Sequence, residues 1–235
     1  EMQYQCAIKR YWKDIQFDLI LYSTPPITFN RVISSQKKRC KAKSYLLLKD
    51  IFPQNAVDLG MFSKRSLIYR LFRKKEEVLY QISDFIGCMS PANVDYVLTH
   101  NPEIKADRVE ICNSIKLLEK PLMTSTARKN ILQKLHIPIN KTLFIYGGNL
   151  GRPQGLIFLL DVIAANEERN DSYFIIVGSG TEYGKIKSWF ETNNPDNSML
   201  LSSLPKKEYD DLVKACDVGL IFLDRRFTIP NYPSR

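Results

Sequence analysis

The sequence predicts an α/β protein built from two doubly wound parallel sheets. Eight short apolar runs alternate with eight longer segments of helical spacing, an order typical of strand–helix–strand units with right-handed crossovers. The runs are apolar throughout, which indicates strands that are covered on both faces. A break in the pattern near the middle of the chain favours two sheets over one, and predicts two domains at residues 1–120 and 121–235.

The individual elements follow from the spacing of the apolar residues. Strands are predicted at 18–23, 45–48, 85–89, 109–112, 143–146, 173–177, 199–201 and 218–223. Helices are predicted at 1–14, 27–39, 63–81, 91–99, 125–135, 154–168, 182–192 and 206–215. After the polar helix at 125–135, a fresh strand–helix series starts at Lys141, and this restart marks the second domain.

The composition is that of a globular chain with an excess of basic residues. Hydrophobic residues make up 44% and charged residues 25% of the chain, which excludes a disordered or collagen-like protein. The formal net charge is +9, and +7 of it lies in residues 1–120. Such a charge suggests nucleic acid, an anionic membrane or a phosphorylated substrate as partners. Because Lys and Arg are not interleaved with the aromatic residues, no nucleic-acid partner is expected.

Neither a metal site nor a membrane-spanning segment is expected. No two of the five cysteines are closer than 24 residues, the two histidines are His100 and His136, and D-x-D does not occur. Metal sites need clustered ligands, so this pattern predicts none. No apolar run approaches the roughly 18 residues of a membrane span, and the start does not resemble a signal peptide. The sequence therefore predicts a reduced, cytoplasmic protein.

A glycine-rich turn between a predicted strand and helix carries the strongest chemical signal. The stretch FIYGGNLGRPQGL has four glycines within the nine residues 147–155. Glycines let a backbone approach a ligand, and the free N–H groups at a helix start favour a phosphate. A second turn, with Gly178 and Gly180, follows the next strand, so both turns would face one crevice. The alternative is a pair of tight turns without a ligand.

The order of these motifs resembles a known family. FIYGGNLGRPQGL, IIVGSGTE, SLPKKEYDDLVKACDVGLIFL and PNYPSR are similar to the donor-binding domain of GT-B glycosyltransferases. The likeness is greatest to family 4 retaining enzymes of bacterial capsule and O-antigen synthesis, in the L-fucosamine-transferase-like branch. In the first half, FDLILYSTPP, YLLLKDIFPQ, RKKEEVLYQISDFIGCMSP and VEICNSI look like the later part of the acceptor domain.

This resemblance implies a GT-B fold with two Rossmann-like domains, both truncated. An acceptor-side domain would lie in 1–120 and a nucleotide-sugar donor domain in 121–235. Further family segments are expected before Glu1 and after Arg235, so the chain alone is a candidate inactive fragment. The expected donor is a nucleotide-sugar, with a UDP-sugar favoured, and the expected acceptor is a glycan or a polyprenyl-diphosphate-linked molecule. No separate cofactor is implied.

The resemblance also assigns donor-binding residues. They are Gly147, Gly148, Asn149, Gly151, Arg152, Gly178, Gly180, Ser203, Leu204, Ser234 and Arg235. Many family members carry Arg where Asn149 stands and Lys where Gln154 stands. The donor diphosphate would therefore depend here on backbone N–H groups, on Arg152 and on Arg235.

Asp50 is the candidate catalytic residue. It follows the predicted strand 45–48, where related enzymes place a His or Asp that faces the reacting sugar. A carboxylate there could orient or deprotonate an acceptor hydroxyl. The alternative is that Asp50 caps a short helix that begins near Phe52 and Pro53. From the sequence, both interpretations stay open.

The segment 61–75, MFSKRSLIYRLFRKK, combines an apolar stripe with many basic residues. The stripe consists of Leu67, Ile68, Leu71 and Phe72, and six Lys or Arg residues occupy much of the remaining surface. One interpretation is peripheral binding to the anionic cytoplasmic face of the inner membrane. The other is a helix packed in the core with a solvated basic face. The lipid-linked acceptors of the family favour the first.

The resemblance therefore implies a metal-independent glycosyltransferase of bacterial surface polysaccharide synthesis that retains the donor's anomeric configuration. One alternative is a nucleotide-sugar epimerase with the same GT-B fold. The other is a basic membrane- or nucleic-acid-binding module without catalysis.

Overall fold

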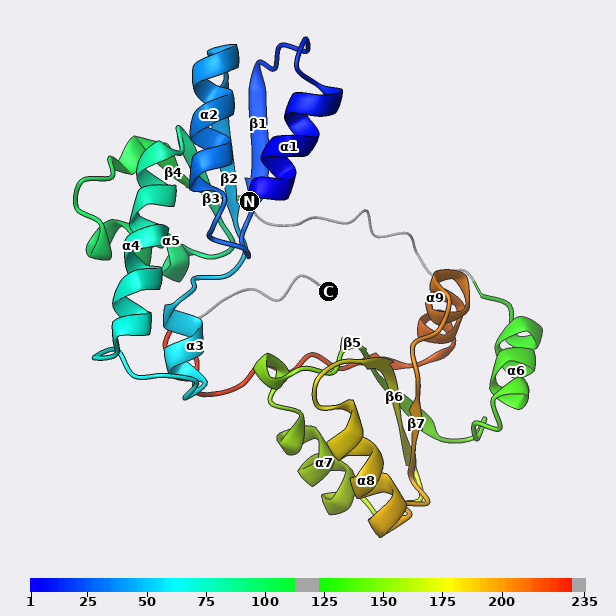
Figure 1. The fold of residues 1–235 in the computed structure, drawn as a ribbon. Coiled ribbons are helices and arrows are strands. Elements are labelled where there is room, and N and C mark those ends of the chain that lie inside the picture. Colours follow the sequence, from blue (N-terminus) through cyan, green and yellow to red (C-terminus); the bar gives the residue numbers. More distant parts are fainter. Residues whose placement is uncertain (113–122, 230–235) are drawn as a thin grey trace. The chain divides into compact units, whose positions relative to one another are not determined.

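The computed structural model describes residues 1–112 and 123–229 (Figure 1). Its described residues form two compact units, one of residues 1–112 with 226–229 and the other of residues 123–225. Each unit contains a four-stranded sheet in which every neighbouring pair of strands is parallel. The predicted α/β class with two parallel sheets is therefore confirmed.

In the first unit, the chain adds each new strand to the same side of the growing sheet. Its order is β1-β2-β3-β4, with β1 at Leu19–Ser23, β2 at Lys43–Leu48, β3 at Phe85–Cys88 and β4 at Val109–Ile111. The helices are α1 (Met2–Tyr11), α2 (Asn30–Cys40), α3 (Gln54–Asp58), α4 (Leu67–Ile82) and α5 (Pro91–His100). Because right-handed crossovers that always move the same way leave their helices on one face, α2, α4 and α5 share a side of the sheet (Figure 1).

Only that face of the first sheet is packed. Leu46 and Ile86 are fully buried beneath the helices, whereas Leu19, Leu21 and Phe85 are 55%, 60% and 44% exposed. Alternate strand residues point to opposite faces, so the exposed side chains mark the face without a helix layer. The prediction that these strands are covered on both faces is therefore wrong for the described part of the first unit.

The buried carboxylate of Glu76 anchors α4 to α5. Its side chain, 1% exposed, accepts hydrogen bonds from Arg73 Nη1 and from the Tyr80 hydroxyl, both at 2.7 Å. Arg73 Nη2 also donates to Oδ1 of Asn101, which follows α5, at 2.6 Å. Desolvation raises the pKa of Glu76 to about 7, against the opposing effect of Arg73 and Tyr80. Arg73, predicted on the solvated basic face, thus turns inward.

In the second unit, the order in which the chain adds strands to the sheet reverses once. Its order is β7-β6-β5-β8, with β5 at Thr142–Asn149, β6 at Ser172–Ser179, β7 at Ser198–Leu201 and β8 at Val218–Gly219. The chain moves outward from β5 to β7 and then returns to pair β8 on the other side of β5. This reversal is the topological switch point of a doubly wound sheet.

Helices cover both faces of this second sheet. They are α6 (Ser125–Lys134), α7 (Leu156–Ala165), α8 (Tyr183–Asn193) and α9 (Lys206–Ala215). One core joins Leu143 and Ile175 to Leu132 of α6 and Leu212 of α9. A separate core joins Tyr146, Phe174 and Ile176 to Leu159 and Ile163 of α7 and Ile186 of α8. Figure 1 shows α7 and α8 together on one side of this sheet.

The end of the described chain packs on the first unit. The backbone N–H and the hydroxyl of Thr228 donate to Asp58 Oδ2 at 2.8 and 2.9 Å, and Ile229 joins the core of that unit. Residues 226–229 were predicted in the second domain, whereas in the structure they pack on the short helix α3, which supplies Asp58. The predicted boundary at 120/121 lies outside the described residues.

Candidate functional site

The two glycine turns lie side by side at the carboxyl edge of the second sheet. In the parallel register, Gly148 is the partner of Gly178, and Asn149 is the partner of Ser179. Beyond this pair, Leu150 N donates to Ser179 O at 2.8 Å, and Glu182 N donates to Leu150 O at 2.9 Å. Backbone hydrogen bonds therefore join the carboxyl ends of β5 and β6. We call this edge, residues 147–152 with 178–180, the ledge.

Two of the glycines are required by packing against backbone. A Cβ on Gly178 would lie 1.9 Å from the carbonyl oxygen of Gly148, and one on Gly180 would lie 2.5 Å from that of Leu150. A Cβ on Gly147 would meet only the end of the Tyr209 side chain of α9, at 2.1 Å from its hydroxyl, and that side chain can move. Close packing, which was the alternative to a ligand, thus explains Gly178 and Gly180.

Three of the remaining residues of the turn are open to solvent. Gly148, whose φ is 127°, and Asn149 are exposed, and so is Arg152 in the short 3₁₀ turn Arg152–Gln154. Gly151 is buried, and the side chain of Asn149 lies over it. The structure therefore presents an exposed peptide segment and one cationic side chain at the ledge.

Helix α7 begins directly behind this segment without a capping side chain. Its N-cap, Gly155, has a φ of 60°, and its first turn contains no acidic residue. Uncapped N–H groups and the helix dipole favour an anion at this end. The chain that follows β8 lies against the same turn, because Asp224 N donates to Pro153 O at 2.9 Å. The uncapped helix end therefore lies at the switch point between β5 and β8.

Asp224 was not predicted as part of the site. A Cβ on Gly155 would lie 3.0 Å from the Asp224 Cα, so its backbone closes one side of the turn. The available sequence signal was its position at the end of the apolar run 218–223. That run was predicted as a six-residue strand, but only Val218 and Gly219 pair with β5.

Other predicted donor residues follow β7 or lie outside the described residues. Ser203 is exposed beyond the carboxyl end of β7, at the same edge of the sheet. Leu204 instead packs its side chain against the core shared with α6 and α9. Ser234 and Arg235 lie outside the described residues.

Asp50, the candidate catalytic residue, belongs to the first unit. It follows β2, and its backbone is held by Thr24, whose Oγ1 donates to Asp50 O at 3.1 Å and accepts from Asp50 N at 3.3 Å. The N-cap of α3 is Pro53, without a side-chain hydrogen bond, so the capping interpretation of Asp50 is wrong. Among the described residues its exposed carboxylate has no hydrogen-bond or ion-pair partner, and partial desolvation raises its pKa while Lys49 opposes the shift.

The basic segment 61–75 exposes most of its apolar stripe. Met61 is 60% exposed, Leu67 77%, Ile68 54% and Leu71 58%. Phe72 alone of the predicted stripe turns inward, where it contacts Phe52 and Phe62 at centroid distances of 5.0 and 6.4 Å. Helix α4 begins at Leu67 rather than at 63, because Ser66 Oγ accepts a capping bond from Tyr69 N. The core-packed interpretation therefore fails for the first turns of α4.

Neither a cluster of metal ligands nor a membrane-spanning helix occurs among the described residues. Within residues 1–112 and 123–229, no three His, Cys, Asp or Glu residues lie close enough to hold a metal ion. Over the same residues, none of the helices combines the length and the hydrophobicity that crossing a bilayer requires.

Comparisons with known proteins agree with the fold. No protein-family model matches the chain. The probable glycosyltransferase WbjE of Pseudomonas aeruginosa is 24% identical over 220 residues, which cover 93% of this chain and 54% of WbjE. The crystal structure of Anabaena HepE with UDP matches with a TM-score of 0.65 at 14% identity, and covers 92% of this chain and 55% of HepE.

A second solved structure gives the same result. WaaG, a glycosyltransferase involved in lipopolysaccharide biosynthesis, matches with a TM-score of 0.61 at 14% identity, over 86% of this chain and 60% of WaaG. These matches confirm the predicted GT-B fold, which the two parallel-sheet units share with the solved enzymes. The chain spans about half the length of WbjE and HepE.

Proposed function

We propose that this chain is part of a GT-B glycosyltransferase that transfers a sugar from a nucleotide-sugar donor to a glycan or polyprenyl-diphosphate-linked acceptor. The observation that carries the proposal is the turn with exposed Gly148, Asn149 and Arg152 in front of the uncapped α7, at the switch point of the doubly wound sheet. Open α/β sheets bind ligands at this place. Crystal structures of HepE contain UDP and UDP-glucose, which favours a UDP-sugar as the donor.

The donor diphosphate would bind to the backbone of the second unit. The N–H groups of Gly148, Asn149 and the first turn of α7 would donate to its oxygens, and exposed Arg152 would add one positive charge. Such preorganised donors stabilise the negative charge that develops as the sugar leaves. Ser234 and Arg235 are retained as donor-side candidates on the basis of the sequence resemblance.

Asp50 would act on the acceptor side. Its carboxylate is free of structural partners among the described residues, while Thr24 fixes its backbone. In a retaining transfer the bond between the anomeric carbon and the diphosphate oxygen breaks on the face where the acceptor oxygen bonds. The acceptor proton then passes to the departing diphosphate, with Asp50 orienting the hydroxyl. The sequence resemblance supports family 4 retaining transferases, and within them the fucosamine branch, as the group to which we assign this proposed enzyme.

Turnover by the full-length protein tests this function. Incubation with UDP-, GDP-, CDP- and dTDP-sugars is expected to transfer sugar from one donor to a lipid-linked or glycan acceptor. Asp50→Asn should lower kcat at least about 100-fold, whereas the exposed Asp95→Asn on α5 should leave it unchanged. Sugar isomerisation without an acceptor would indicate the epimerase instead, and normal turnover by Asp50→Asn would reject the assigned role.

We further propose that the first turns of α4 bind the anionic cytoplasmic face of the membrane, where surface polysaccharides are assembled. The apolar Leu67 and Ile68 are exposed beside Lys64, Arg65 and Arg70. Basic residues near an anionic bilayer contribute about 1 kcal/mol each, and exposed apolar side chains can insert at the interface. The protein would then be cytoplasmic and peripheral to the inner membrane.

Co-sedimentation with vesicles tests the membrane contact. Binding is expected to vesicles that contain phosphatidylglycerol and to be weak with pure phosphatidylcholine. The double variant Leu67→Ser with Ile68→Ser should reduce binding several-fold. Ile157→Ser removes a similarly exposed side chain, 74% accessible, from α7 of the second unit and should have no effect. Equal losses from both variants would count against α4 as the contact surface.

A further inference from the structure

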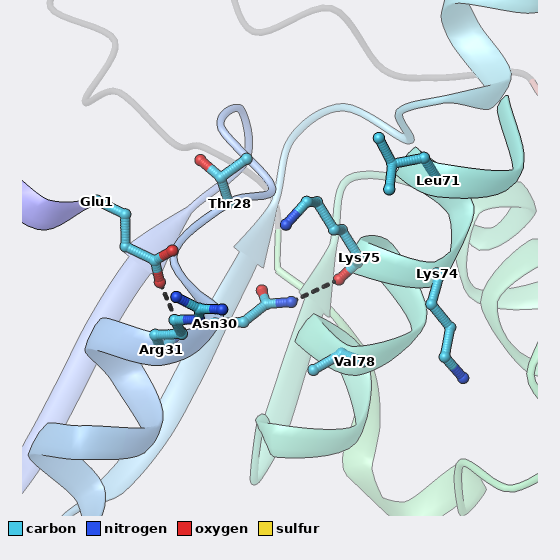
Figure 2. A pocket seen from close by; sticks show the side chains of 8 residues that line it. All are labelled: Glu1, Thr28, Asn30, Arg31, Leu71, Lys74, Lys75 and Val78. Carbon is cyan, nitrogen blue, oxygen red and sulfur yellow. Dashed lines mark hydrogen bonds between the residues drawn. The ribbon is translucent and has the colours of Figure 1, made fainter. Parts of the chain in front are cut away.

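A pocket of about 320 Å³ lies between α2 and α4 of the first unit (Figure 2). Its lining includes Arg31, Lys74 and Lys75, but the start of α2 already has an acceptor. The backbone N–H groups of Arg31 and Val32 donate to Glu1 Oε1 at 2.6 and 3.1 Å. Because Glu1 satisfies these N–H groups, we assign no ligand to the pocket.

A different part of the chain contacts both candidate sites. Residues 223 and 224 pack against the turn between the ledge and α7, and residues 226–229 pack against α3, which follows Asp50. The chain passes from the second unit to the first between Arg225 and Arg226. We call residues 223–229 the strap.

The first residues of the strap are held by the turn that precedes α7. Asp224 N donates to Pro153 O at 2.9 Å. A Cβ on Gly155, the N-cap of α7, would lie 3.0 Å from the Asp224 Cα and 3.5 Å from the Leu223 carbonyl carbon. The strap therefore begins in close contact with the helix start that is proposed to receive the donor diphosphate.

The other end of the strap is held by Asp58, the last residue of α3. Asp58 Oδ2 accepts from the backbone N–H and the hydroxyl of Thr228 at 2.8 and 2.9 Å, and Asp58 Oδ1 accepts from Gln54 Nε2 at 2.6 Å. Gln54 is 2% exposed. Hydrogen bonds to a carboxylate are stronger than those between neutral groups. Both oxygens of Asp58 thus fix the strap to α3.

This anchor belongs to the segment that carries Asp50. Ile51 follows Asp50 directly, is 2% exposed, and shares a core with Ile229 of the strap. Thr24 holds the backbone of Asp50 itself. A displacement of the strap is therefore resisted by the same segment that sets the position of the Asp50 carboxylate.

We propose that Asp58 is a positioning residue for the transfer reaction. By anchoring the strap, it limits how far the donor turn and the Asp50 segment move relative to each other during the transfer. Asp224 and Thr228 are four positions apart, and an extended chain gains at most about 3.6 Å per residue. The strap therefore leaves little slack between its two anchors. This role rests on the proposed function and adds a residue that contacts neither substrate.

The physical reason is the geometry that the reaction requires. The acceptor hydroxyl, oriented by Asp50, must meet the anomeric carbon of the donor in a near-attack arrangement. A misplacement of about 1 Å can lower the rate about 100-fold. Loss of the Asp58 anchor should therefore slow the transfer without weakening the binding of the nucleotide to the second unit.

Kinetics of the full-length protein test this role. Asp58→Ala should lower kcat at least about tenfold, while the Kd of the donor nucleotide, from isothermal titration, stays within about twofold. Because Asp58 acts through Asp50, the double variant Asp58→Ala with Asp50→Asn should be no slower than Asp50→Asn alone. Asp95→Ala, which removes an exposed carboxylate from α5, is the matched control and should change neither kcat nor Kd.

Thr228 supplies a milder variant that keeps the test valid if Asp58→Ala does not fold. Thr228→Val removes one of the two hydrogen bonds to Asp58 Oδ2 and should lower kcat about threefold. Thr228→Ser retains the hydroxyl and should keep the original kcat. Thr99→Val, on the exposed surface of α5, is its control. Circular dichroism checks that each variant is folded.

The possible failures are distinguishable. If the original protein transfers sugar and Asp50→Asn does not, an unchanged kcat in folded Asp58→Ala or Thr228→Val overturns the role of Asp58 and leaves the proposed function in place. Multiplying losses in the double variant, or a loss of nucleotide affinity as large as the loss of kcat, would also overturn it, because the effect would then be a general structural one. Absence of transfer by the original protein would reject the proposed function and this role together.

Discussion

The two sheets of this protein differ in how their strands are ordered. The first runs β1-β2-β3-β4 without a reversal, and the second runs β7-β6-β5-β8 with a reversal at β5. The first sheet is therefore packed on one face, with Leu19 and Leu21 exposed on the other. The second has a helix layer and a core on each face. Strand order thus decides both where apolar surface is left open and where a ligand crevice forms.

This difference separates the roles of the two units. The switch point, the glycine ledge and the uncapped α7 all lie in the second unit, which suits it to bind a diphosphate. The first unit carries the exposed start of α4 and Asp50, whose carboxylate has no partner among the described residues. Substitutions that act on one unit only can therefore test the comparison.

The largest expected effect comes from Gly178→Ala in the second unit. The added Cβ would lie 1.9 Å from the Gly148 carbonyl oxygen, and the φ of Gly178 is 154°, so the ledge must deform. We expect a loss of about 4 kcal/mol or more in the free energy of unfolding of this unit. Urea unfolding followed by the fluorescence of Trp189, which packs against one of its cores, measures the change.

Gly184→Ala is the matched control for that substitution. Gly184 lies in α8, and a Cβ there meets nothing within 4 Å. Gly184 is the second residue of α8. Alanine is favoured over glycine by about 1 kcal/mol in a helix interior and by less near a helix end, so this variant should be as stable as the original chain or slightly more stable. Similar destabilisation by both variants would contradict the close packing of β5 against β6.

The next effect compares the two faces of the first sheet. Leu46→Ala empties a site that is 0% exposed, and should cost about 2–5 kcal/mol. Leu21→Ser changes a side chain that is 60% exposed on the open face, and should change stability by less than about 0.5 kcal/mol. Urea denaturation followed by circular dichroism compares them. A large cost for Leu21→Ser would mean that this face is covered.

A smaller, pH-dependent effect is expected from Glu76→Gln. Burial raises the pKa of Glu76 to about 7 in the folded chain, above its value in an unfolded chain, so the folded state holds the proton more tightly. The stability from this group is present at low pH and is lost as the pH rises through 7. As the pH rises from 5.5 to 8, the free energy of unfolding of Glu76→Gln should therefore increase relative to that of the original chain by about 1 kcal/mol or more.

Urea midpoints of both chains at pH 5.5 and pH 8 test this dependence. Asp95→Asn, an exposed carboxylate on α5 of the same unit, should show no comparable change. If the stability of the original chain rises relative to Glu76→Gln over this range, the direction of the Glu76 shift is wrong.

Most of the fold could be predicted because apolar periodicity reflects local packing. All eight predicted strands and all eight predicted helices are present, though several differ at their ends. β5 was predicted to end at Tyr146 but runs to Asn149, because Gly147 and Gly148 pattern as a turn while their backbone still pairs with β6. The short helix α3 entered the prediction only through the capping interpretation of Asp50, because its five residues are too few to show a period.

The site could be predicted only in part. Adjacent glycine turns follow from the geometry of parallel strands, so the pairing of Gly148 with Gly178 was foreseeable. The packing role of Gly147 was not, because its neighbour Tyr209 lies on a helix that is distant in sequence. The sequence also could not show whether Asp50 caps the short helix, because only the structure shows that Pro53 is the N-cap of α3.

The central claim, that a nucleotide diphosphate binds at the ledge of the second unit, is tested most directly by backbone amide NMR during a titration with UDP. We expect saturable shifts of the N–H resonances of Gly148, Asn149, Gly151 and the first turn of α7, with little change in β1–β4. GDP, CDP and dTDP serve as comparisons for the choice of base. Saturable nucleotide binding that leaves these amides unshifted, or no binding of any of the four nucleotides, would contradict the account.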